Sequence, residues 1–326
     1  MERPITVTEI QEAKHRISTI AYRTPLFHSP SLSALAKAEV YLKLESFQPI
    51  RAFKIRGAAN KILKLSPKER ERGFVAASSG NHGLAVAYVA NLIHSNATIV
   101  VPTTAVDEKV RAIKEYKGEV VKHGLFHDER LSKALEIQKT NGAIFVHPFD
   151  DPDIIAGQGT IGLEIVEDLP DVNVVIVPIG GGGLISGIAT AIKGLKPAAR
   201  VIGVEPERAS SMQQSILTGK ITRLDDTRSI ADGLATREPS LLTFAIARTL
   251  VDEIFLVTEQ EIEKAVFTVL HECHLVIEPS AAAAVAALFK MNFRKTEKVA
   301  VVVSGGNISI KILAQVLSKY GQNPKP

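Results

Sequence analysis

The segment "VNVVIVPIGGGGLISGIATAIKG", residues 172–194, decides the fold class because four glycines join an apolar run to a helix-like run. The apolar run, 172–179, is rich in Val and Ile with almost no polar alternation, which is typical of a strand covered on both faces. A helix-like run begins at Ile185. A strand followed directly by a helix is the βα unit from which parallel sheets are built.

Seven other runs of the same kind repeat this unit along the chain. They cover residues 73–79, 97–102, 118–124, 143–148, 200–207, 253–259 and 298–306. Stretches with helical spacing, such as 107–118 and 259–276, lie between most of them. The βαβα alternation predicts an α/β fold with parallel strands and helices on both faces. Because four runs cluster before residue 149 and the others begin at 172, we expect two α/β lobes with a cleft between them.

The composition argues against several classes of partner. The 326 residues include 39 Lys and Arg against 35 Asp and Glu, with no tryptophan and no basic block interleaved with aromatic residues, so we expect no nucleic-acid binding. The N-terminus is polar, and the longest apolar stretch is broken by Pro178 and the glycines, so we expect no membrane span. The single cysteine, Cys273, cannot form a disulfide within the chain and fits a reducing cytoplasm.

The four glycines follow their strand directly, at the place where open α/β sheets bind ligands. Glycines leave backbone N–H groups unobstructed and a helix N-terminus adds positive potential, so the loop favours a phosphate over a simple turn. The dinucleotide fingerprint G-x-G-x-x-G does not fit, because its last position is Ser186. Glu205 nevertheless ends the next strand, where a ribose-binding acid would stand, so a nicotinamide-dependent oxidoreductase is an alternative.

Two other strands also end in polar, glycine-containing loops. The loop 78–83, "SSGNHG", begins a helix and either binds a carboxylate through its polar groups or caps that helix. The loop 304–307, "SGGN", follows a buried strand, and a plain turn is an equally good interpretation. Glu278, ahead of Pro279 and an alanine-rich helix, is interpreted as an acid that favours the helix dipole.

Lys54 and the segment "HECH" each allow a structural and a chemical interpretation. Lys54 stands in "FQPIRAFKIRGAAN", residues 47–60, where an extended stretch turns into a helix-friendly run. It is either a solvated lysine at a helix start or an inward-pointing amine with a chemical role. In "HECH", residues 271–274, only His271 and His274 would share a helix face with Cys273 pointing elsewhere, so we expect no metal there.

A lysine, a phosphate cradle, a carboxylate-binding loop and a strand-end hydroxyl together suit one cofactor, pyridoxal phosphate. Its aldehyde needs a lysine, its phosphate needs the glycines and its ring nitrogen needs a partner. Over nearly its whole length, the chain resembles the fold type II pyridoxal-phosphate enzymes of the threonine dehydratase and serine racemase family. The matching stretches, which agree in order and spacing, are "RTPL" (23–26), "YLKLESFQP" (41–49), "FKIRGA" (53–58), "SSGNHG" (78–83), "HPFDDPDIIAGQGTIGLEI" (147–165), "PIGGGGLISG" (178–187), "GVEPE" (203–207), "IADGLA" (230–235), "IEPSAA" (277–282) and "VVSGGN" (302–307).

The resemblance implies a fold like that of the tryptophan synthase β subunit, with two doubly wound α/β domains and the cofactor in the cleft between them. Residues 1–66 and 150–326 would form the large cofactor-binding domain, and residues 67–149 the small mobile domain. Family members are often dimers or tetramers, so the resemblance also implies a homo-oligomer.

The resemblance further implies a role for each site residue. Lys54 would hold the cofactor covalently and remove the substrate α-proton, and Ser79 matches the second acid/base of serine racemases. The other cofactor contacts would be Phe53 against the ring, Asn81 at the ring hydroxyl, Gly180, Gly181, Gly182, Gly183 and Leu184 around the phosphate, Gly233 beside the ring, and Ser304 at the ring nitrogen. Ser78, Asn81 and His82 would receive the substrate carboxylate.

The implied activity is that of a threonine dehydratase (threonine ammonia-lyase), which eliminates water and ammonia from L-threonine, and from L-serine, to give 2-oxobutanoate or pyruvate. Ser79 favours a serine racemase instead. At position 149, however, the chain has Phe149 as in dehydratases, where serine racemases have an asparagine. Arg51 allows a 3-hydroxyaspartate dehydratase, although we expect its side chain to be solvated. The alternatives from other classes are the nicotinamide-dependent oxidoreductase and a catalytically silent amino-acid-binding regulator.

A cation site is the last expectation that the resemblance carries. The family's site uses an acid like Glu205, a backbone carbonyl like that of Ala209, and a second acid two residues later, where this chain has Ser211. Mg or Ca needs several oxygen ligands, so the lost carboxylate weakens this expectation.

Overall fold

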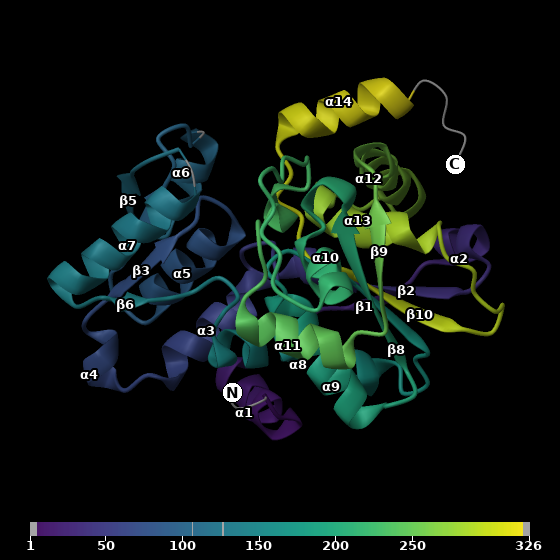
Figure 1. The fold of residues 1–326 in the computed structure, drawn as a ribbon, viewed down its shortest axis with the longest axis horizontal. Coiled ribbons are helices and arrows are strands. Elements are labelled where there is room, and N and C mark those ends of the chain that lie inside the picture. Colours follow the sequence, from purple (N-terminus) through teal and green to yellow (C-terminus); the bar gives the residue numbers. More distant parts are fainter. Residues whose placement is uncertain (1–4, 106, 126, 322–326) are drawn as a thin grey trace.

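Two largely parallel sheets with helices on both faces confirm the α/β class (Figure 1). The computed structural model describes residues 5–105, 107–125 and 127–321. One sheet has six strands in the order β1-β2-β10-β7-β8-β9, and the other has four in the order β5-β4-β3-β6. Among the described strands, only β1 pairs antiparallel to its neighbour β2.

The six-stranded sheet and its helices form what we call the large lobe. Its strands are β1 (Leu26–His28), β2 (Glu39–Leu44), β7 (Val174–Pro178), β8 (Arg200–Pro206), β9 (Glu253–Val257) and β10 (Lys298–Val303). Its α-helices are α1 (Val7–Ile17), α2 (Pro30–Ala36), α3 (Lys54–Lys64), α8 (Pro152–Asp168), α9 (Gly183–Leu195), α10 (Ser211–Thr218), α11 (Leu241–Leu250), α12 (Glu259–Cys273), α13 (Pro279–Leu288) and α14 (Ile310–Tyr320). Three short 3-10 turns are η1 (Glu45–Phe47), η2 (Glu207–Ala209) and η3 (Asp232–Leu234).

The four-stranded sheet and its helices form the small lobe, seen on the left of Figure 1. Its strands are β3 (Phe74–Ala77), β4 (Ala97–Val101), β5 (Glu119–Lys122) and β6 (Ile144–Phe145). Its helices are α4 (Pro67–Arg70), α5 (Asn81–Leu92), α6 (Asp107–Glu115) and α7 (His127–Asn141). The chain enters this lobe after α3 and returns to the large lobe through residues 146–151.

Burial on both faces explains why the strand runs lack polar alternation. Along β7, Val174 and Ile176 pack into a core with α12 and α13, whereas Val175 and Val177 pack into a second core with α8 and α9. All ten residues of α13 are buried, and Pro279 begins it at a position where a missing N–H costs nothing. Helix α3 packs against α8 of the large lobe and α5 of the small lobe, so its first residue lies close to the junction of the lobes.

The structure departs from the predicted elements in two places. Strands β1 and β2 were not among the predicted runs, because β2 reads "EVYLKL" and its Lys43 is a buried charge that resembles a surface residue in sequence. The helix predicted over 259–276 ends at Cys273, because His274 adopts a left-handed conformation with φ of 54°. Within the described part of the chain, no helix is long and apolar enough to cross a bilayer.

Candidate active site

Lys54 is the first residue of α3, and its side chain reaches the junction of the two lobes. The amine donates a hydrogen bond to the carbonyl oxygen of Pro148, with 2.7 Å between Nζ and oxygen. Pro148 belongs to the segment that returns from the small lobe to the large one. Burial lowers the pKa of Lys54 to about 8, although the carboxyl group of Glu278 opposes this shift. Of the two interpretations of Lys54, the structure therefore supports the inward-pointing amine.

The loop after β10 holds the backbone on either side of Lys54. The N–H of Phe53 donates to the carbonyl oxygen of Ser304 at 3.0 Å, and Ala52 forms an isolated antiparallel bridge with Gly305. Ser304 is buried, and the Phe53 ring lies beneath the Lys54 amine, 5.1 Å from Nζ to the ring centre. The "SGGN" loop is therefore more than a plain turn, because it fixes the position of the lysine.

The "SSGNHG" loop leads into α5 without a side-chain cap. Gly80 occupies the N-cap position, and no side chain among the described residues caps the helix there. The Ser78 hydroxyl instead accepts the N–H of Gly80 at 3.3 Å, and Ser79 is partly buried beside it. A Cβ on Gly83 would lie 2.1 Å from the carbonyl oxygen of Ser78, so only glycine allows the loop to fold back on the helix. No side chain of the described residues occupies the first N–H groups of α5. Of the two interpretations of this loop, anion binding therefore fits the structure better than helix capping.

His82, the second residue of α5, is a buried neutral imidazole. Its Nε2 lies 2.8 Å from the carbonyl oxygen of Val146, so Nε2 carries the proton and donates. Burial, with a further contribution from the Lys54 amine, lowers the pKa of His82 to about 3. Lys54 and the "SSGNHG" loop therefore interact electrostatically.

The four glycines form a loop that side chains would obstruct. Gly182 has φ of 91° and precedes α9, and a Cβ on it would lie 2.6 Å from Met212. A Cβ on Gly181 would lie 2.3 Å from the Phe149 ring, and one on Gly183 would lie 2.8 Å from the same residue. Gly182 offers no side chain to cap α9, so the N–H groups of the first turn, where Leu184 lies, are available to an anion.

Neighbouring contacts connect this glycine loop to Lys54. Phe149, which packs against the loop, directly follows Pro148, the acceptor of the Lys54 amine. On the other side of the loop, the carbonyl oxygen of Gly233 lies 3.0 Å from the position of a Cβ on Gly180. Phe149 and Gly233 thus lie against the glycine loop, and Phe149 connects that loop to the residue that accepts from Lys54.

Glu278 lies at the start of α13, where the sequence interpretation placed it, but its carboxylate also has partners outside that helix. It occupies the N-cap position of α13, but its side chain makes no capping hydrogen bond within the described part of the chain. Its carboxylate oxygens instead accept hydrogen bonds from Nδ2 of Asn81, at 2.9 and 3.1 Å, and from the N–H of Asn307, at 3.2 Å. Burial raises the pKa of Glu278 to about 7. Asn81 and Asn307 come from other elements, so the sequence near Glu278 contains no sign of these contacts.

A buried ion network supports the helix that begins at Lys54. The Arg56 guanidinium makes two hydrogen bonds to Glu45, both at 2.8 Å, and two to Glu164, at 2.7 and 2.9 Å. Lys43 completes the network, 2.6 Å from Nζ to a Glu164 oxygen. Burial opposes ionisation of Glu164, but the Arg56 and Lys43 charges hold its pKa below the usual value. Sequence reasoning missed this network, although "FKIRGA" contains Arg56.

The expected cation ligands lie elsewhere, next to α10. The Glu205 carboxylate accepts hydrogen bonds from the N–H groups of Met212 and Gln213, at 2.9 and 2.8 Å, and burial raises its pKa to about 8. Ala209 is buried nearby in η2, and the Ser211 hydroxyl is buried without a hydrogen-bond partner in the described part of the chain. One carboxylate that already accepts two N–H groups is a poor fit to Mg or Ca, so we assign the cation no role in the reaction.

Two further sequence interpretations can be compared with the structure. The Arg51 side chain is exposed, as expected, and its carbonyl oxygen accepts the N–H of Gly306 at 2.9 Å. His271 and His274 do not share a helix face, because α12 ends at Cys273 and His274 is its left-handed C-cap. Among the described residues, no group of three or more His, Cys, Asp or Glu side chains is placed to hold a metal.

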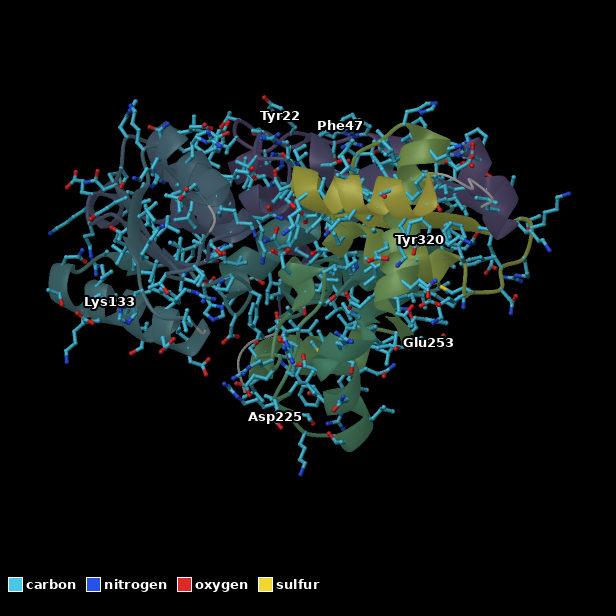
Figure 2. All side chains as sticks on the ribbon, turned by 90° about the horizontal axis from the view of Figure 1, so that it is seen from above. Tyr22, Phe47, Lys133, Asp225, Glu253 and Tyr320 are labelled. Atoms are coloured by element: carbon cyan, nitrogen blue, oxygen red, sulfur yellow. The ribbon has the colours of Figure 1, made fainter. Side chains whose placement is uncertain are left out.

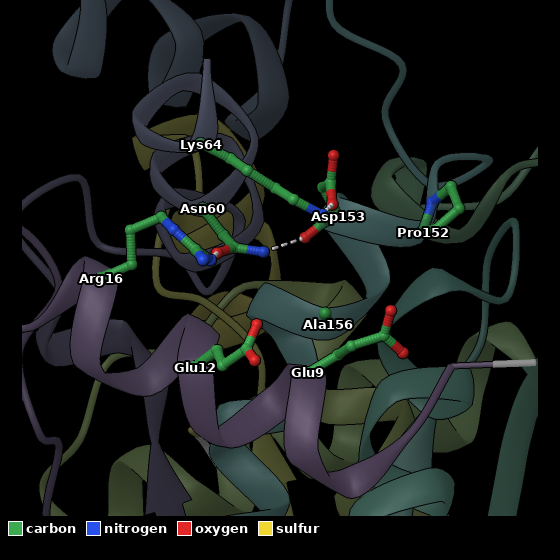
Figure 3. A pocket seen from close by; sticks show the side chains of 8 residues that line it. All are labelled: Glu9, Glu12, Arg16, Asn60, Lys64, Pro152, Asp153 and Ala156. Carbon is green, nitrogen blue, oxygen red and sulfur yellow. Dashed lines mark hydrogen bonds and ion pairs between the residues drawn. The ribbon is translucent and has the colours of Figure 1, made fainter. Parts of the chain in front are cut away.

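A small polar pocket of about 50 Å³ lies at the other end of α3 (Figure 3). Its lining comes from α1, α3 and the start of α8, where Asn60 bonds to the carbonyl oxygen of Asp153 at 2.6 Å and Lys64 pairs with the Asp153 carboxylate. Glu9 and Glu12 add two more carboxylates to the lining. These carboxylates outnumber the two cations of the lining, Arg16 and Lys64, and the excess negative charge disfavours a phosphate or a substrate carboxylate, so the pocket is not the candidate active site.

Comparison with known families identifies the cofactor. The family model described as "Pyridoxal-phosphate dependent enzyme" matches residues 17–305. The chain belongs to this family. Its membership agrees with the site. A lysine of lowered pKa suits the aldehyde of pyridoxal phosphate, and the uncapped helix start at Gly182, connected to it through Pro148 and Phe149, suits the phosphate.

Relatives of this pyridoxal-phosphate enzyme include proteins named for two activities. The chain is 45% identical to the L-threonine ammonia-lyase of Thermotoga maritima, over 97% of this chain and 79% of the relative. It is 42% identical to the catabolic L-threonine dehydratase of Escherichia coli K12, over 96% of each chain. Its structure is similar to that of maize serine racemase, with a TM-score of 0.92 and 36% identity over 99% of both chains.

Proposed function

We propose that this pyridoxal-phosphate enzyme is an L-threonine dehydratase, which removes water and ammonia from L-threonine to give 2-oxobutanoate and from L-serine to give pyruvate. The observation that carries the proposal is the Lys54 amine of lowered pKa at the junction of the lobes, within electrostatic reach of a carboxylate-binding loop. The relatives named as threonine ammonia-lyase and dehydratase support the choice of substrate.

Residues of both lobes would hold the cofactor. The N–H groups of Gly180, Gly181, Gly182, Gly183 and Leu184 would bind its phosphate, Asn81 its ring hydroxyl, and Phe53, Gly233 and Ser304 would surround its ring. When bound, pyridoxal phosphate supplies an electron sink for the pair released at the substrate Cα. The Ser304 hydroxyl is neutral, so it would leave the ring nitrogen unprotonated.

The remaining residues would bind the substrate and move its proton. Ser78, Asn81 and His82 would receive the carboxylate at the start of α5, where free N–H groups stabilise negative charge. His82 is neutral and adds no charge there. The Lys54 amine, with a pKa of about 8, would take the α-proton, because a base is most effective when its pKa lies near the working pH.

We also propose that residues 67–149 move as a small mobile domain that closes over the site. Exposed ion pairs join this lobe to a loop of the large lobe, from Lys109 to Asp232 at 2.9 Å and from Asp128 to Arg223 at 2.6 Å. Such pairs contribute little stability and break easily, which suits a reversible closure. Closure would exclude water from the substrate.

Cofactor uptake is expected to depend on the ionisation of Lys54. Only the neutral amine attacks an aldehyde, so the rate of uptake by the cofactor-free protein should rise as the pH passes through about 8, the pKa of Lys54. Stopped-flow absorbance at a series of pH values measures this rate. A midpoint near 10.5, the ordinary value for lysine, would show that burial does not activate this amine.

Racemisation of serine is a second candidate activity, favoured by Ser79 and by the structural similarity to maize serine racemase. If Ser79 supplies a proton on the opposite face of Cα, Ser79→Ala should abolish D-serine formation and leave elimination within a few-fold of wild type. Chiral chromatography alongside an oxo-acid assay measures both. Equal loss of the two activities would instead assign Ser79 to substrate binding.

The experiment that tests the proposed function is a comparison of substrates. Purified, cofactor-loaded protein is incubated separately with L-threonine, L-serine and 3-hydroxyaspartate, and oxo acid, ammonia and D-serine are measured. We expect oxo acid and ammonia in equal amounts, fastest from L-threonine. Faster inversion of serine than elimination would make the protein a racemase, and absence of turnover with every substrate would favour the amino-acid-binding regulator.

We further propose that the enzyme is a cytoplasmic homo-oligomer. Tyr22 and Phe47, labelled together at one edge of Figure 2, are 59% and 51% exposed, and both backbone groups of Tyr22 bond to Gln48, next to Phe47. Exposed aromatic side chains are enriched at protein interfaces. Light scattering of the purified protein measures the mass, and a monomer at micromolar concentration would contradict the proposal.

A further inference from the structure

Asn81 is the point at which the start of α5 is tied to the large lobe. Its Nδ2 donates to both carboxylate oxygens of Glu278, at 2.9 and 3.1 Å. Its Oδ1 accepts a hydrogen bond from Nδ2 of Asn307 at 2.8 Å. Both ends of one small-lobe amide are therefore held by side chains of the large lobe, across the junction where Lys54 lies.

This arrangement is directional because a carboxylate only accepts hydrogen bonds. An ionised Glu278 forces the NH₂ group of Asn81 towards itself, which leaves the Asn81 oxygen facing Asn307. Nδ2 of Asn307 also donates to the carbonyl oxygen of Ile50 at 2.9 Å, so this second amide is fixed in orientation as well. The network thus selects one of the two flipped states of Asn81.

The backbone around the network is built to admit the carboxylate. A Cβ on Gly305 would lie 2.6 Å from Oε1 of Glu278, so the glycine makes room for it. The N–H of Glu278 donates to the carbonyl oxygen of Gly305 at 3.1 Å, and the N–H of Asn307 donates to the carboxylate. Glu278 is 7% exposed, and the charged groups that act on it are Lys54 from α3, Asp232 from η3 and Lys109 from α6.

We propose that Glu278 and Asn307 are positioning residues that orient the Asn81 amide and dock the start of α5 against the large lobe before any ligand binds. This inference rests on the proposed function for its catalytic meaning, because Asn81 is the residue proposed to meet the ring hydroxyl of the cofactor. The docking itself involves only side chains of the protein, so it can be measured without cofactor or substrate.

The test uses Glu278→Gln, which keeps the size of the side chain and removes its charge. Glutamine keeps one acceptor oxygen and replaces the other by an NH₂ group, so one of the donors that face the carboxylate, the NH₂ of Asn81 or the N–H of Asn307, loses its acceptor. We expect backbone hydrogen exchange over residues 81–84 of the cofactor-free protein to accelerate at least about tenfold, as befits a weakened hydrogen bond to a charged acceptor. The dissociation constant for pyridoxal phosphate and the KM for L-threonine should rise, with a smaller change in kcat.

Glu297→Gln is the matched control. Glu297 is also 7% exposed, but it precedes β10, at the opposite end of that strand from Ser304. In this control variant, backbone hydrogen exchange over residues 81–84 and the affinity for pyridoxal phosphate should equal those of the wild type. If Glu278→Gln behaves like this control in hydrogen exchange, the positioning role is overturned, whatever the enzyme's activity. If exchange accelerates in Glu278→Gln while the wild-type enzyme does not turn over L-threonine, the docking holds and the proposed function fails.

A double variant separates orientation from docking. In Asn81→Asp with Glu278→Gln, the new glutamine donates and the new aspartate accepts, so the contact is restored with reversed polarity. We expect slow hydrogen exchange to return while cofactor affinity stays low, because the NH₂ group of Asn81 is gone. Recovery of cofactor affinity as well would show that the orientation of Asn81 is irrelevant and would overturn that part of the proposal.

Discussion

Replacing Lys54 by alanine is expected to slow the release of oxo acid from L-threonine by at least about 10²- to 10⁴-fold, the range that a positioned acid or base contributes. The variant loses both the attachment point of the cofactor and the base beside Cα. Its fold should persist, because within the described part of the chain the amine makes a single hydrogen bond, to the carbonyl oxygen of Pro148. Kinetic assays with saturating pyridoxal phosphate, and the visible absorbance of the bound cofactor, measure both losses.

Lys64→Ala is the matched control for this experiment. Lys64 is the last residue of the same helix and pairs with Asp153 at the surface, so its loss should leave turnover unchanged. If Lys54→Ala retained more than about a tenth of the wild-type rate, neither proton transfer nor attachment could depend on Lys54. Circular dichroism of both variants would show whether a loss of activity reflects a loss of structure.

Replacing Arg56 by methionine should destabilise the protein by about 3–5 kcal/mol, the usual effect of removing one partner from a buried ion pair. The guanidinium neutralises Glu45 and Glu164, which are 0% and 3% exposed. Methionine fills most of the volume but leaves both carboxylates buried, with Lys43 as the remaining cation of the network. Denaturant unfolding of the cofactor-free protein measures the free energy of unfolding.

An exposed ion pair provides the comparison for Arg56. Arg228 pairs with Asp226 at 2.9 Å and is 87% exposed, so Arg228→Met should unfold at the wild-type denaturant concentration. If Arg56→Met lowered the free energy of unfolding by less than about 1 kcal/mol, the buried network would contribute no more stability than an exposed ion pair.

The elements that sequence analysis predicted well are those whose burial is local and uniform. The run that became β7 is buried on both faces, so its lack of polar alternation predicted its environment directly. The glycines that follow it predicted unobstructed N–H groups ahead of a helix, and the structure has no side-chain cap there and a φ of 91° at Gly182 that favours glycine.

Residues whose partners come from distant parts of the chain could not be placed from sequence. Lys43 looks like a surface residue in sequence, and its burial is explained by Glu164 and by the carbonyl oxygen of Thr24, which accepts from Nζ at 2.7 Å. Glu278 stands where an acid favours a helix dipole, yet its partners are Asn81 and Asn307. In both cases, local sequence shows the charge but not the group that compensates it.

Lys54 lies between these two cases. Its own segment allows a solvated lysine. The structure supports the inward orientation through residues far along the chain, because Pro148 accepts from the Lys54 amine and Ser304 accepts from the N–H of the preceding residue, Phe53. The combination of several strand-end loops was what indicated a cofactor. Each loop alone permitted a structural explanation, because capping and tight turns use the same residue types as anion binding.

The central claim is that pyridoxal phosphate is attached to Lys54 at the junction of the lobes. The most direct measurement is reduction of the cofactor-loaded protein with borohydride, which converts the linkage into a stable amine, followed by peptide mass spectrometry. We predict one modified peptide, the one that contains Lys54, and its disappearance in Lys54→Ala. A modification on another lysine, or no modification with the cofactor in excess, would contradict the claim and remove the basis for the proposed elimination chemistry.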